Sequence, residues 1–169
     1  MTFYRATEDL PPFEDYRMAN RTHRFFTGRP LFPFGHGLSY TRFRYDQARL
    51  VRPEIGIDDT VQLSLDLVNV GGRDGDEVVQ VYARRLEAND QQLPRHALCA
   101  FQRVAVPKGQ RAMVELAVPA RTLRHWDPQL KSYVVDPGTY ELQIGASSED
   151  IRISTSVRIK AGPVSAKLP

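Results

Sequence analysis

The chain has 169 residues, and its 41% hydrophobic and 25% charged residues are typical of a globular protein rather than a disordered one. The formal net charge is only +3 and no basic run stands out, so we expect no nucleic-acid partner. No stretch approaches the roughly eighteen consecutive apolar residues that cross a membrane, so we expect no membrane partner either. A single cysteine, Cys99, excludes an internal disulfide and a cysteine-based metal site.

The first forty residues have no helical or strand periodicity, yet they hold nine of the sixteen aromatic residues. A disordered linker should be poor in aromatic rings, because exposing them to water is costly. In PLFPFGHGLSY, residues 30–40, prolines that fix φ alternate with glycines that permit positive φ, so the segment specifies one irregular path. We therefore predict an irregular, aromatic-rich arm over 1–40 that is ordered against the rest of the chain or against a neighbouring domain.

From about residue 42 onward, apolar and polar residues alternate with period two, which is typical of half-buried strands. Within 61–67, for example, one face carries Val61, Leu63, Leu65 and Leu67. The alternation predicts seven or eight strands, at 42–50, 61–67, 76–84, 97–106, 111–118, a short piece near 122–126, 139–146 and 151–159.

Turn-forming residues separate these strands, at 71–75, 107–109 and 136–138. Short strands without helical periodicity between them favour an all-β fold, an antiparallel β-sandwich of the fibronectin type III or immunoglobulin-like kind. We expect the sandwich to span 41–162 and a short tail to follow at 163–169.

Hydrolytic chemistry would require a pair of carboxylates or an activated nucleophile. Adjacent acidic residues occur at 14–15, 58–59, 74–77 and 149–150, but all except the first lie in predicted turns, where solvated turn residues are the simpler interpretation. We name no catalytic residue.

Metal and cofactor binding are equally unsupported by the sequence. Four isolated histidines lack the spacing of metal ligands: His23, His36, His96 and His125. His36, between two glycines, has the most unusual context, and it either reaches a neighbouring site or makes a backbone hydrogen bond. We predict no metal and no cofactor.

Trp126 is the only tryptophan in the chain. Sugar-binding modules expose aromatic rings as stacking platforms, which makes Trp126 a candidate sugar contact. No second ring follows at platform spacing, so we favour a position in the core or between the sheets.

Several of these motifs together resemble a known family. PLFPFGHGLSYTRFRY, VNVGGRDGDEVVQVY, AFQRVAVPKGQ and DPGTYELQIGASSEDIR occur in this order and resemble the C-terminal fibronectin type III-like domain of glycoside hydrolase family 3. The first 26 residues are similar to the end of the preceding α/β sandwich domain and its linker, most of all in the β-xylosidase branch and next in the β-glucosidases. Where the family often has Asn-Thr-Gly, this chain has Asn69-Val70-Gly71.

The resemblance implies a non-catalytic module, because the catalytic residues of the family belong to a barrel domain and an α/β sandwich domain. Its partners would be these two domains of the same polypeptide, and the resemblance also allows a homodimer partner. The parent enzyme would be periplasmic or secreted. The resemblance also implies that arm residues pack between domains, namely Phe25, Phe26, Phe32, Phe34, His36 and Tyr40. The alternatives are a carbohydrate-binding module, with Trp126 as a sugar contact, and an adhesin-like fibronectin domain unrelated to hydrolases.

Overall fold

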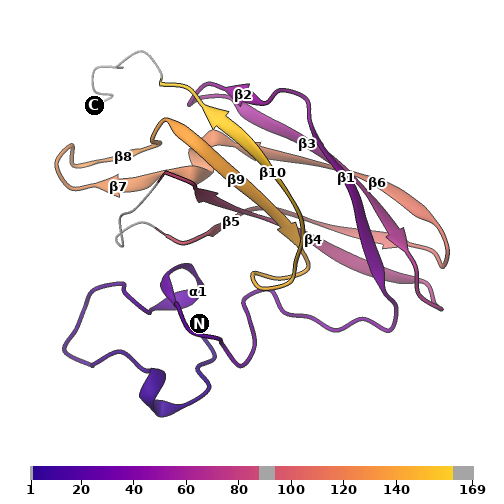
Figure 1. The fold of residues 1–169 in the computed structure, drawn as a ribbon, viewed down its shortest axis with the longest axis horizontal. Helices are drawn as coiled ribbons and strands as arrows, with labels where there is room; N and C mark the ends of the chain where they lie inside the picture. Colours follow the sequence, from indigo (N-terminus) through magenta and orange to yellow (C-terminus); the bar gives the residue numbers. More distant parts are fainter. Residues whose placement is uncertain (1, 88–93, 162–169) are drawn as a thin grey trace.

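The computed structural model describes residues 2–87 and 94–161, and it contains two sheets that pack face to face together with a small hairpin (Figure 1). The first sheet has the strand order β1-β3-β6, with β1 at Phe43–Leu50, β3 at Thr60–Asn69 and β6 at Arg111–Pro119. The second has the order β2-β10-β9-β4-β5, formed by β2 (Glu54–Ile55), β4 (Gly75–Arg85), β5 (Ala97–Val106), β9 (Gly138–Gly145) and β10 (Ile151–Ile159). This confirms the all-β sandwich.

The alternation read from the sequence corresponds to the core of the sandwich. Val61, Leu63, Leu65 and Leu67 of β3 are at most 2% exposed and lie in one cluster with Val79 and Val81 of β4 and Leu142 and Ile144 of β9. The β3 and β6 strands pair antiparallel from Thr60 opposite Pro119 to Val68 opposite Arg111, so the apolar faces of both strands point the same way. Burying such a face is the main stabilising contribution to a sandwich.

Two short strands were not predicted, and the piece near 122–126 was only partly right. The β2 strand pairs parallel with β10 over two residues, too few to show an alternation. Residues Ala120–Leu123 form a 3-10 turn, η2, and only then does β7 (His125–Asp127) pair with the unpredicted β8 (Ser132–Val134). This β7–β8 hairpin lies outside both large sheets.

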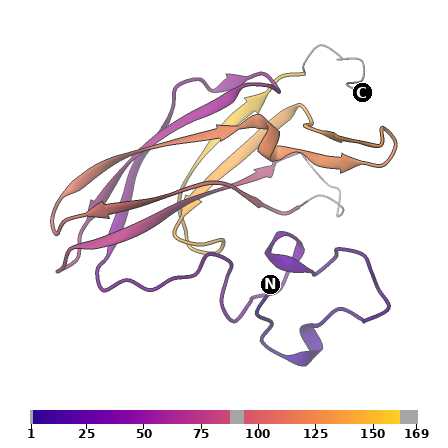
Figure 2. The ribbon, with the colours of Figure 1, turned by 180° about the vertical axis from the view of Figure 1, so that it is seen from behind.

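The arm, residues 2–40, lies beside one end of the sandwich and enters neither sheet (Figure 2). It contains a single 3-10 turn, η1 (Thr7–Asp9), and one helical turn, α1 (Thr22–Phe25). The remainder is irregular, as its composition predicts. The predicted tail at 163–169 lies outside the described residues.

Asn69, at the end of β3, connects the arm's end to the sandwich. The Asn69 side chain is buried, and its Nδ2 donates hydrogen bonds to the carbonyl oxygens of Arg73 and Val106 at 2.8 and 2.9 Å. Its Oδ1 accepts from Thr41 Oγ1 at 2.7 Å and from the Gly71 amide at 3.0 Å. Both donors and both acceptor positions of the amide are therefore used.

Candidate interaction surface

A set of buried polar groups holds residues 34–35 of the arm against β4. Gln80 Nε2 donates to the carbonyl oxygens of Gly35 at 3.2 Å and Ala146 at 2.6 Å. Tyr82 Oη lies 2.6 Å from Gln80 Oε1 and 3.3 Å from the Phe34 carbonyl oxygen, which also accepts the Ser148 amide at 2.9 Å. We call Gln80, Tyr82 and Ser148, with the two arm carbonyls, the arm clamp.

Gly35 is required by this geometry in two ways. Its φ is +79°, a value that side chains rarely adopt. A Cβ at this position would lie 2.1 Å from Gln80 Oε1 and 2.9 Å from Tyr82 Oη. Close approach of the arm backbone to Gln80 and Tyr82 therefore depends on glycine at this position of PLFPFGHGLSY.

Aromatic and imidazole rings continue the contact beyond the clamp. His23 of α1 stacks on Phe34 with ring centroids 3.9 Å apart and an interplanar angle of 9°, and His96 lies 5.5 Å from the Tyr82 ring. Burial, with smaller contributions from His96 and Arg24, lowers the pKa of His23 to about 4. Burial also lowers the pKa of His96 below its usual value. Both rings are therefore neutral near pH 7.

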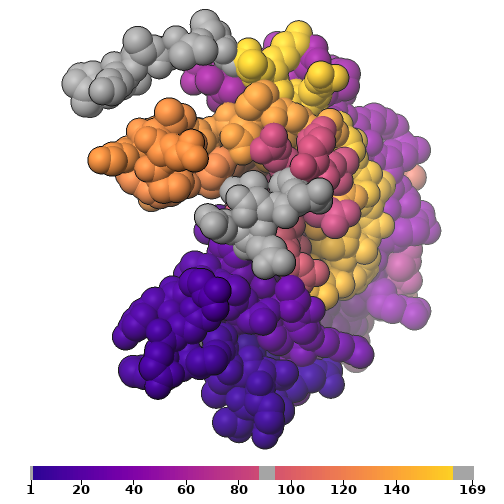
Figure 3. Space-filling view, turned by 60° about the vertical axis from the view of Figure 1, so that its left-hand side comes forward, coloured from indigo at the N-terminus to yellow at the C-terminus, as the bar shows by residue number. Residues whose placement is uncertain are grey.

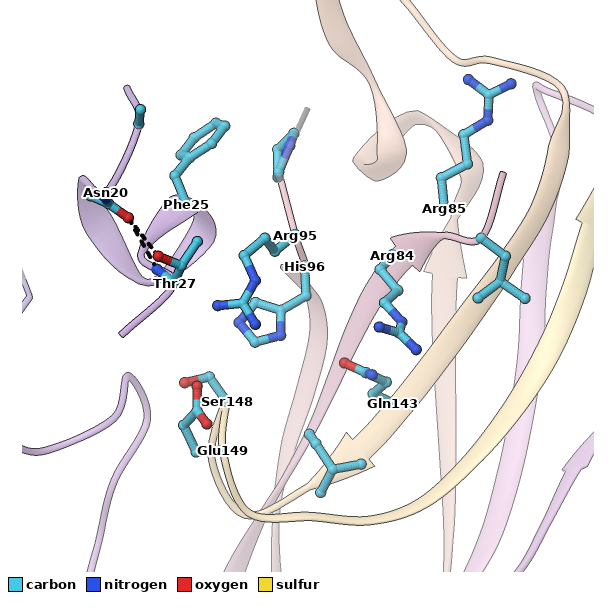
Figure 4. Close-up of a pocket in the computed structure, with 14 residues that line it drawn as sticks. Asn20, Phe25, Thr27, Arg84, Arg85, Arg95, His96, Gln143, Ser148 and Glu149 are labelled. Atoms are coloured by element: carbon cyan, nitrogen blue, oxygen red, sulfur yellow. Dashed lines mark hydrogen bonds between the residues drawn. The ribbon is translucent and has the colours of Figure 1, made fainter. Parts of the chain in front are cut away.

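A cleft of about 670 Å³ separates the outer face of the five-stranded sheet from the arm next to α1 (Figure 4). Three arginines reach its lining, and each has a partner within the protein. Arg84 Nε lies 2.6 Å from Glu141 Oε2, Arg85 Nη1 lies 2.6 Å from Asp136 Oδ2, and Arg95 Nη1 donates to the Phe26 carbonyl oxygen. In the cleft shown, the arginines thus serve internal contacts.

A second hollow, of about 990 Å³, lies between residues 34–43, which lead from the arm into β1, and the outer face of β4 and β5. Its lining includes Val78, Leu98 and Phe101, and Phe101 is 67% exposed. The arm thus covers the outer face of this sheet only in part, and apolar side chains of both the arm and the sheet remain accessible where the two meet.

Exposed apolar side chains are concentrated in the arm. Of the nineteen large hydrophobic residues recorded as exposed among residues 2–87 and 94–161, ten lie in the first forty: Phe3, Leu10, Phe13, Tyr16, Met18, Leu31, Phe32, Phe34, Leu38 and Tyr40. Tyr40 and Leu38 are 92% and 95% exposed, and Phe13 and Tyr16 are each 85% exposed. A concentration of exposed apolar side chains is typical of surfaces that contact another molecule or domain.

The six arm residues named from the sequence have different environments. Phe26 is 7% exposed and packs edge-on against Tyr4, with ring centroids 5.1 Å apart. Phe32 contacts Phe3 and His36 within the arm, at 6.0 and 5.4 Å between centroids. Phe25 is half-buried at the cleft, Phe34 is in the stack described above, and Tyr40 projects from the surface.

The core position favoured for Trp126 is wrong. Trp126 is 52% exposed on the β7–β8 hairpin, directly opposite Tyr133, and the two rings meet edge to face with centroids 5.4 Å apart. The preference failed because the hairpin packs outside both sheets, and a strand of three residues gives no pattern to reveal this. No local pattern indicated the Trp126–Tyr133 pair, since β8 was not predicted.

The acidic pairs have structural partners, as expected for turn residues. Asp59 Oδ2 accepts the Gly56 amide at 2.9 Å, Asp74 Oδ1 accepts the Lys108 amide at 2.7 Å, and Asp150 pairs with Arg152 at 2.6 Å. Within 2–87 and 94–161, no group of three or more histidine, cysteine or acidic residues is arranged to hold a metal ion. No helix in the same residues is long and apolar enough to span a membrane.

The sequence predicted that the arm would be ordered but not what orders it. Gln80, Tyr82 and Ser148 were not singled out, because each is an ordinary residue of a strand or turn when read locally. The one available signal was Gln80, a polar residue between Val79 and Val81 in a strand of high apolar content.

Comparisons with known proteins support the family resemblance found in the sequence. The family description "Fibronectin type III-like domain" matches residues 77–148, from β4 to just after β9. The chain is 37% identical over 150 residues to a xylan 1,4-β-xylosidase of Xylanibacter ruminicola, covering 89% of this chain and 17% of that protein. It is 31% identical over 152 residues to a periplasmic β-glucosidase of Salmonella typhimurium, covering 89% of this chain and 20% of that protein.

Among solved structures, a β-glucosidase from Erythrobacter marinus matches with a TM-score of 0.75 and 29% identity, over 94% of this chain and 21% of that chain. This coverage exceeds what the sandwich residues by themselves supply, so the match extends into the arm. The chain spans about a fifth of the length of the relatives it matches.

Proposed function

This chain carries the fibronectin type III-like domain of glycoside hydrolase family 3, and on that premise we propose that it is a non-catalytic module that packs on the catalytic domains of a β-glycosidase. The observation that carries the proposal is the arm, whose backbone is clamped to the sandwich while its aromatic side chains stay exposed. An arm built to wrap its own sandwich would bury those rings instead.

The interdomain surface in this proposal is formed by Phe25, Phe32, Phe34, His36 and Tyr40 of the predicted set, joined by Phe13, Tyr16 and Leu38. Phe26 supports it from inside the arm, where Tyr4 covers its ring. We place the boundary between the arm and the sandwich at residue 40, because the first strand of the sandwich begins shortly after it, at Phe43. The partners are a barrel domain and an α/β sandwich domain of the same polypeptide.

For the parent enzyme we propose an exo-1,4-β-xylosidase, with a β-glucosidase as the alternative. The xylan 1,4-β-xylosidase of Xylanibacter ruminicola supports this choice with 37% identity over 150 residues. The relative from Salmonella typhimurium that is named periplasmic supports a periplasmic or secreted parent.

The test on the chain itself has two parts. We expect no hydrolysis of nitrophenyl xyloside or nitrophenyl glucoside, and turnover by the pure chain would contradict a non-catalytic role. We also expect the combined variant Phe13→Ser, Tyr16→Ser, Leu38→Ser and Tyr40→Ser to bind less of a hydrophobic dye and to self-associate less, with the unfolding transition unchanged.

The decisive test uses the longer polypeptide that the proposal requires. There the same four substitutions should destabilise the catalytic domains, whereas a control set on exposed sandwich positions, Val51→Ser and Met113→Ser, should not. Equal effects of the two sets would contradict an interdomain role for the arm.

The alternative function, tethering to a polysaccharide through a planar row of rings, has weaker support. Trp126 is exposed, but its plane is inclined by 74° to that of Tyr133, so the pair does not form a flat platform.

A further inference from the structure

A third hollow in the molecule, of about 500 Å³, lies on the side where the arm and the β7–β8 hairpin protrude as two lobes (Figure 3). One wall consists of η2, Arg124 and Tyr133, and the opposite wall consists of α1 and the start of β5. The Arg24 carbonyl oxygen accepts the Arg95 amide at 2.8 Å, which fixes α1 beside β5 and so fixes this wall. The hollow is within the size range of small-ligand sites.

The hollow is strongly basic. Its lining contains Arg24, Arg121 and Arg124 and no acidic residue. Among residues 2–87 and 94–161, none of these three guanidinium groups forms an ion pair, in contrast to Arg84 and Arg85 on the neighbouring cleft. Three unneutralised guanidinium groups around one hollow repel one another, and a bound carboxylate would relieve that repulsion.

Aromatic surface borders the same arginines. Tyr133 is 64% exposed and lines the hollow, Trp126 lies edge-on to it, and Arg124 Cζ is 5.0 Å from the centre of the Tyr133 ring. Trp126 and Tyr133 lie opposite each other in the hairpin, and the residues on either side are also paired, His125 with Val134 and Asp127 with Ser132. Asp127 is not part of the lining, and its Oδ1 accepts the amides of Gln129 and Leu130 in the hairpin turn.

We propose that this hollow binds a carboxylated sugar, a uronic acid residue of an oligosaccharide or polysaccharide. Arg121 and Arg124 would bind the carboxylate, and the exposed Tyr133 ring would pack on the C–H face of the sugar. A neutral sugar gives no reason for three arginines that form no ion pair within 2–87 and 94–161, and a simple anion gives none for the exposed Tyr133 ring. The site goes beyond the proposed packing role, because it lies on the hairpin side of the molecule and uses none of the arm's exposed aromatic residues.

The test is a titration of the chain with a xylo-oligosaccharide that carries one glucuronic acid, followed by calorimetry and by amide chemical shifts. Neutral xylo-oligosaccharide of the same length is the matched ligand. We expect binding of the acidic sugar, weakening with added salt, and chemical-shift changes centred on 121–134. Equal affinity for the two sugars, or no binding of the acidic one at millimolar concentration, would overturn the proposal.

The variant Arg121→Gln with Arg124→Gln should weaken binding of the acidic sugar by at least about tenfold, since hydrogen bonds to charged groups are among the stronger ones. The control variant Arg52→Gln with Arg73→Gln removes the same charge from exposed positions outside the hollow and should leave the affinity unchanged. If both variants weaken binding equally, the attraction is only that of the net charge and the site is wrong.

An acidic peptide, oligoglutamate, distinguishes a sugar from a protein partner. Tighter binding of the peptide than of the acidic sugar at the same hollow would overturn the sugar assignment in favour of a protein partner. These outcomes do not depend on whether the arm packs on other domains, because the variants leave the arm's aromatic residues intact.

Discussion

The sandwich and the arm are held by different forces. In the sandwich, buried apolar side chains from both sheets form one cluster, whereas Phe26 is the single arm residue among the buried hydrophobic residues of 2–87 and 94–161. The arm instead relies on hydrogen bonds to its backbone from Gln80, Tyr82 and Ser148. A segment can therefore be well placed without a core of its own, and its apolar side chains then remain free to contact something else.

The largest effect should come from the core. Leu142→Ala in β9 removes a fully buried side chain and should lower the free energy of unfolding by about 2–5 kcal/mol, through lost burial and a cavity. Chemical denaturation measures the loss. Met113→Ala, at an exposed position of the other sheet, is the control and should change stability by no more than about 0.5 kcal/mol.

Asn69→Ala tests the junction between the two regions. The substitution removes the side-chain donor of two carbonyl oxygens, the buried one of Val106 and the partly buried one of Arg73. It should lower the free energy of unfolding by about 1–3 kcal/mol. Chemical denaturation measures the loss. A change as small as that of Met113→Ala would mean that water replaces the amide without cost.

Gly35→Ala should separate the arm from the sandwich. The new Cβ would meet Gln80 and force an unfavourable φ, at a cost on the order of 1–3 kcal/mol borne by arm docking. Limited proteolysis should cut the arm faster, while the unfolding transition of the sandwich stays close to that of the parent chain. Gly37→Ala is the matched control, because no atom lies within 4 Å of its added Cβ.

The smallest effect should be a pH dependence of arm docking. Because the pKa of His23 is lowered to about 4 in the docked state, the released arm binds a proton more readily below pH 6.5. Docking is therefore fully favourable above about pH 6.5 and weakens as the pH falls towards 4. His96 and Arg24 also lower the pKa of His23, whereas Glu149 acts on His96, whose pKa it raises against the larger effect of burial.

Hydrogen exchange of arm amides at pH 7.5 and pH 5 measures this effect. His23→Phe, which keeps a ring on Phe34 but cannot be protonated, should remove most of the difference. A pH dependence that persists unchanged in this variant would assign it to His96 or to another group.

Local patterns predicted the long strands and the irregular arm, but they missed contacts between segments that lie far apart in the sequence. The inward face of β3 was read correctly from Val61 to Leu67, because a strand with one buried face must alternate. The same rule predicted β4 as a strand but not the burial of its outer face, where Gln80 and Tyr82 are at most 5% exposed. Their burial comes from residues 34–35, more than forty positions away in the sequence.

Local patterns in the sequence predict the long strands, the turns between them and an ordered aromatic arm, because period-two alternation and the φ preferences of proline and glycine are local properties. Tertiary packing alone brings Gly35 against Gln80 and leaves Trp126 exposed beside Tyr133. It also brings an arginine of α1, one of η2 and one directly after η2 around a single hollow. Burial and charge clustering depend on which distant segments pack together, and no local pattern carries that information.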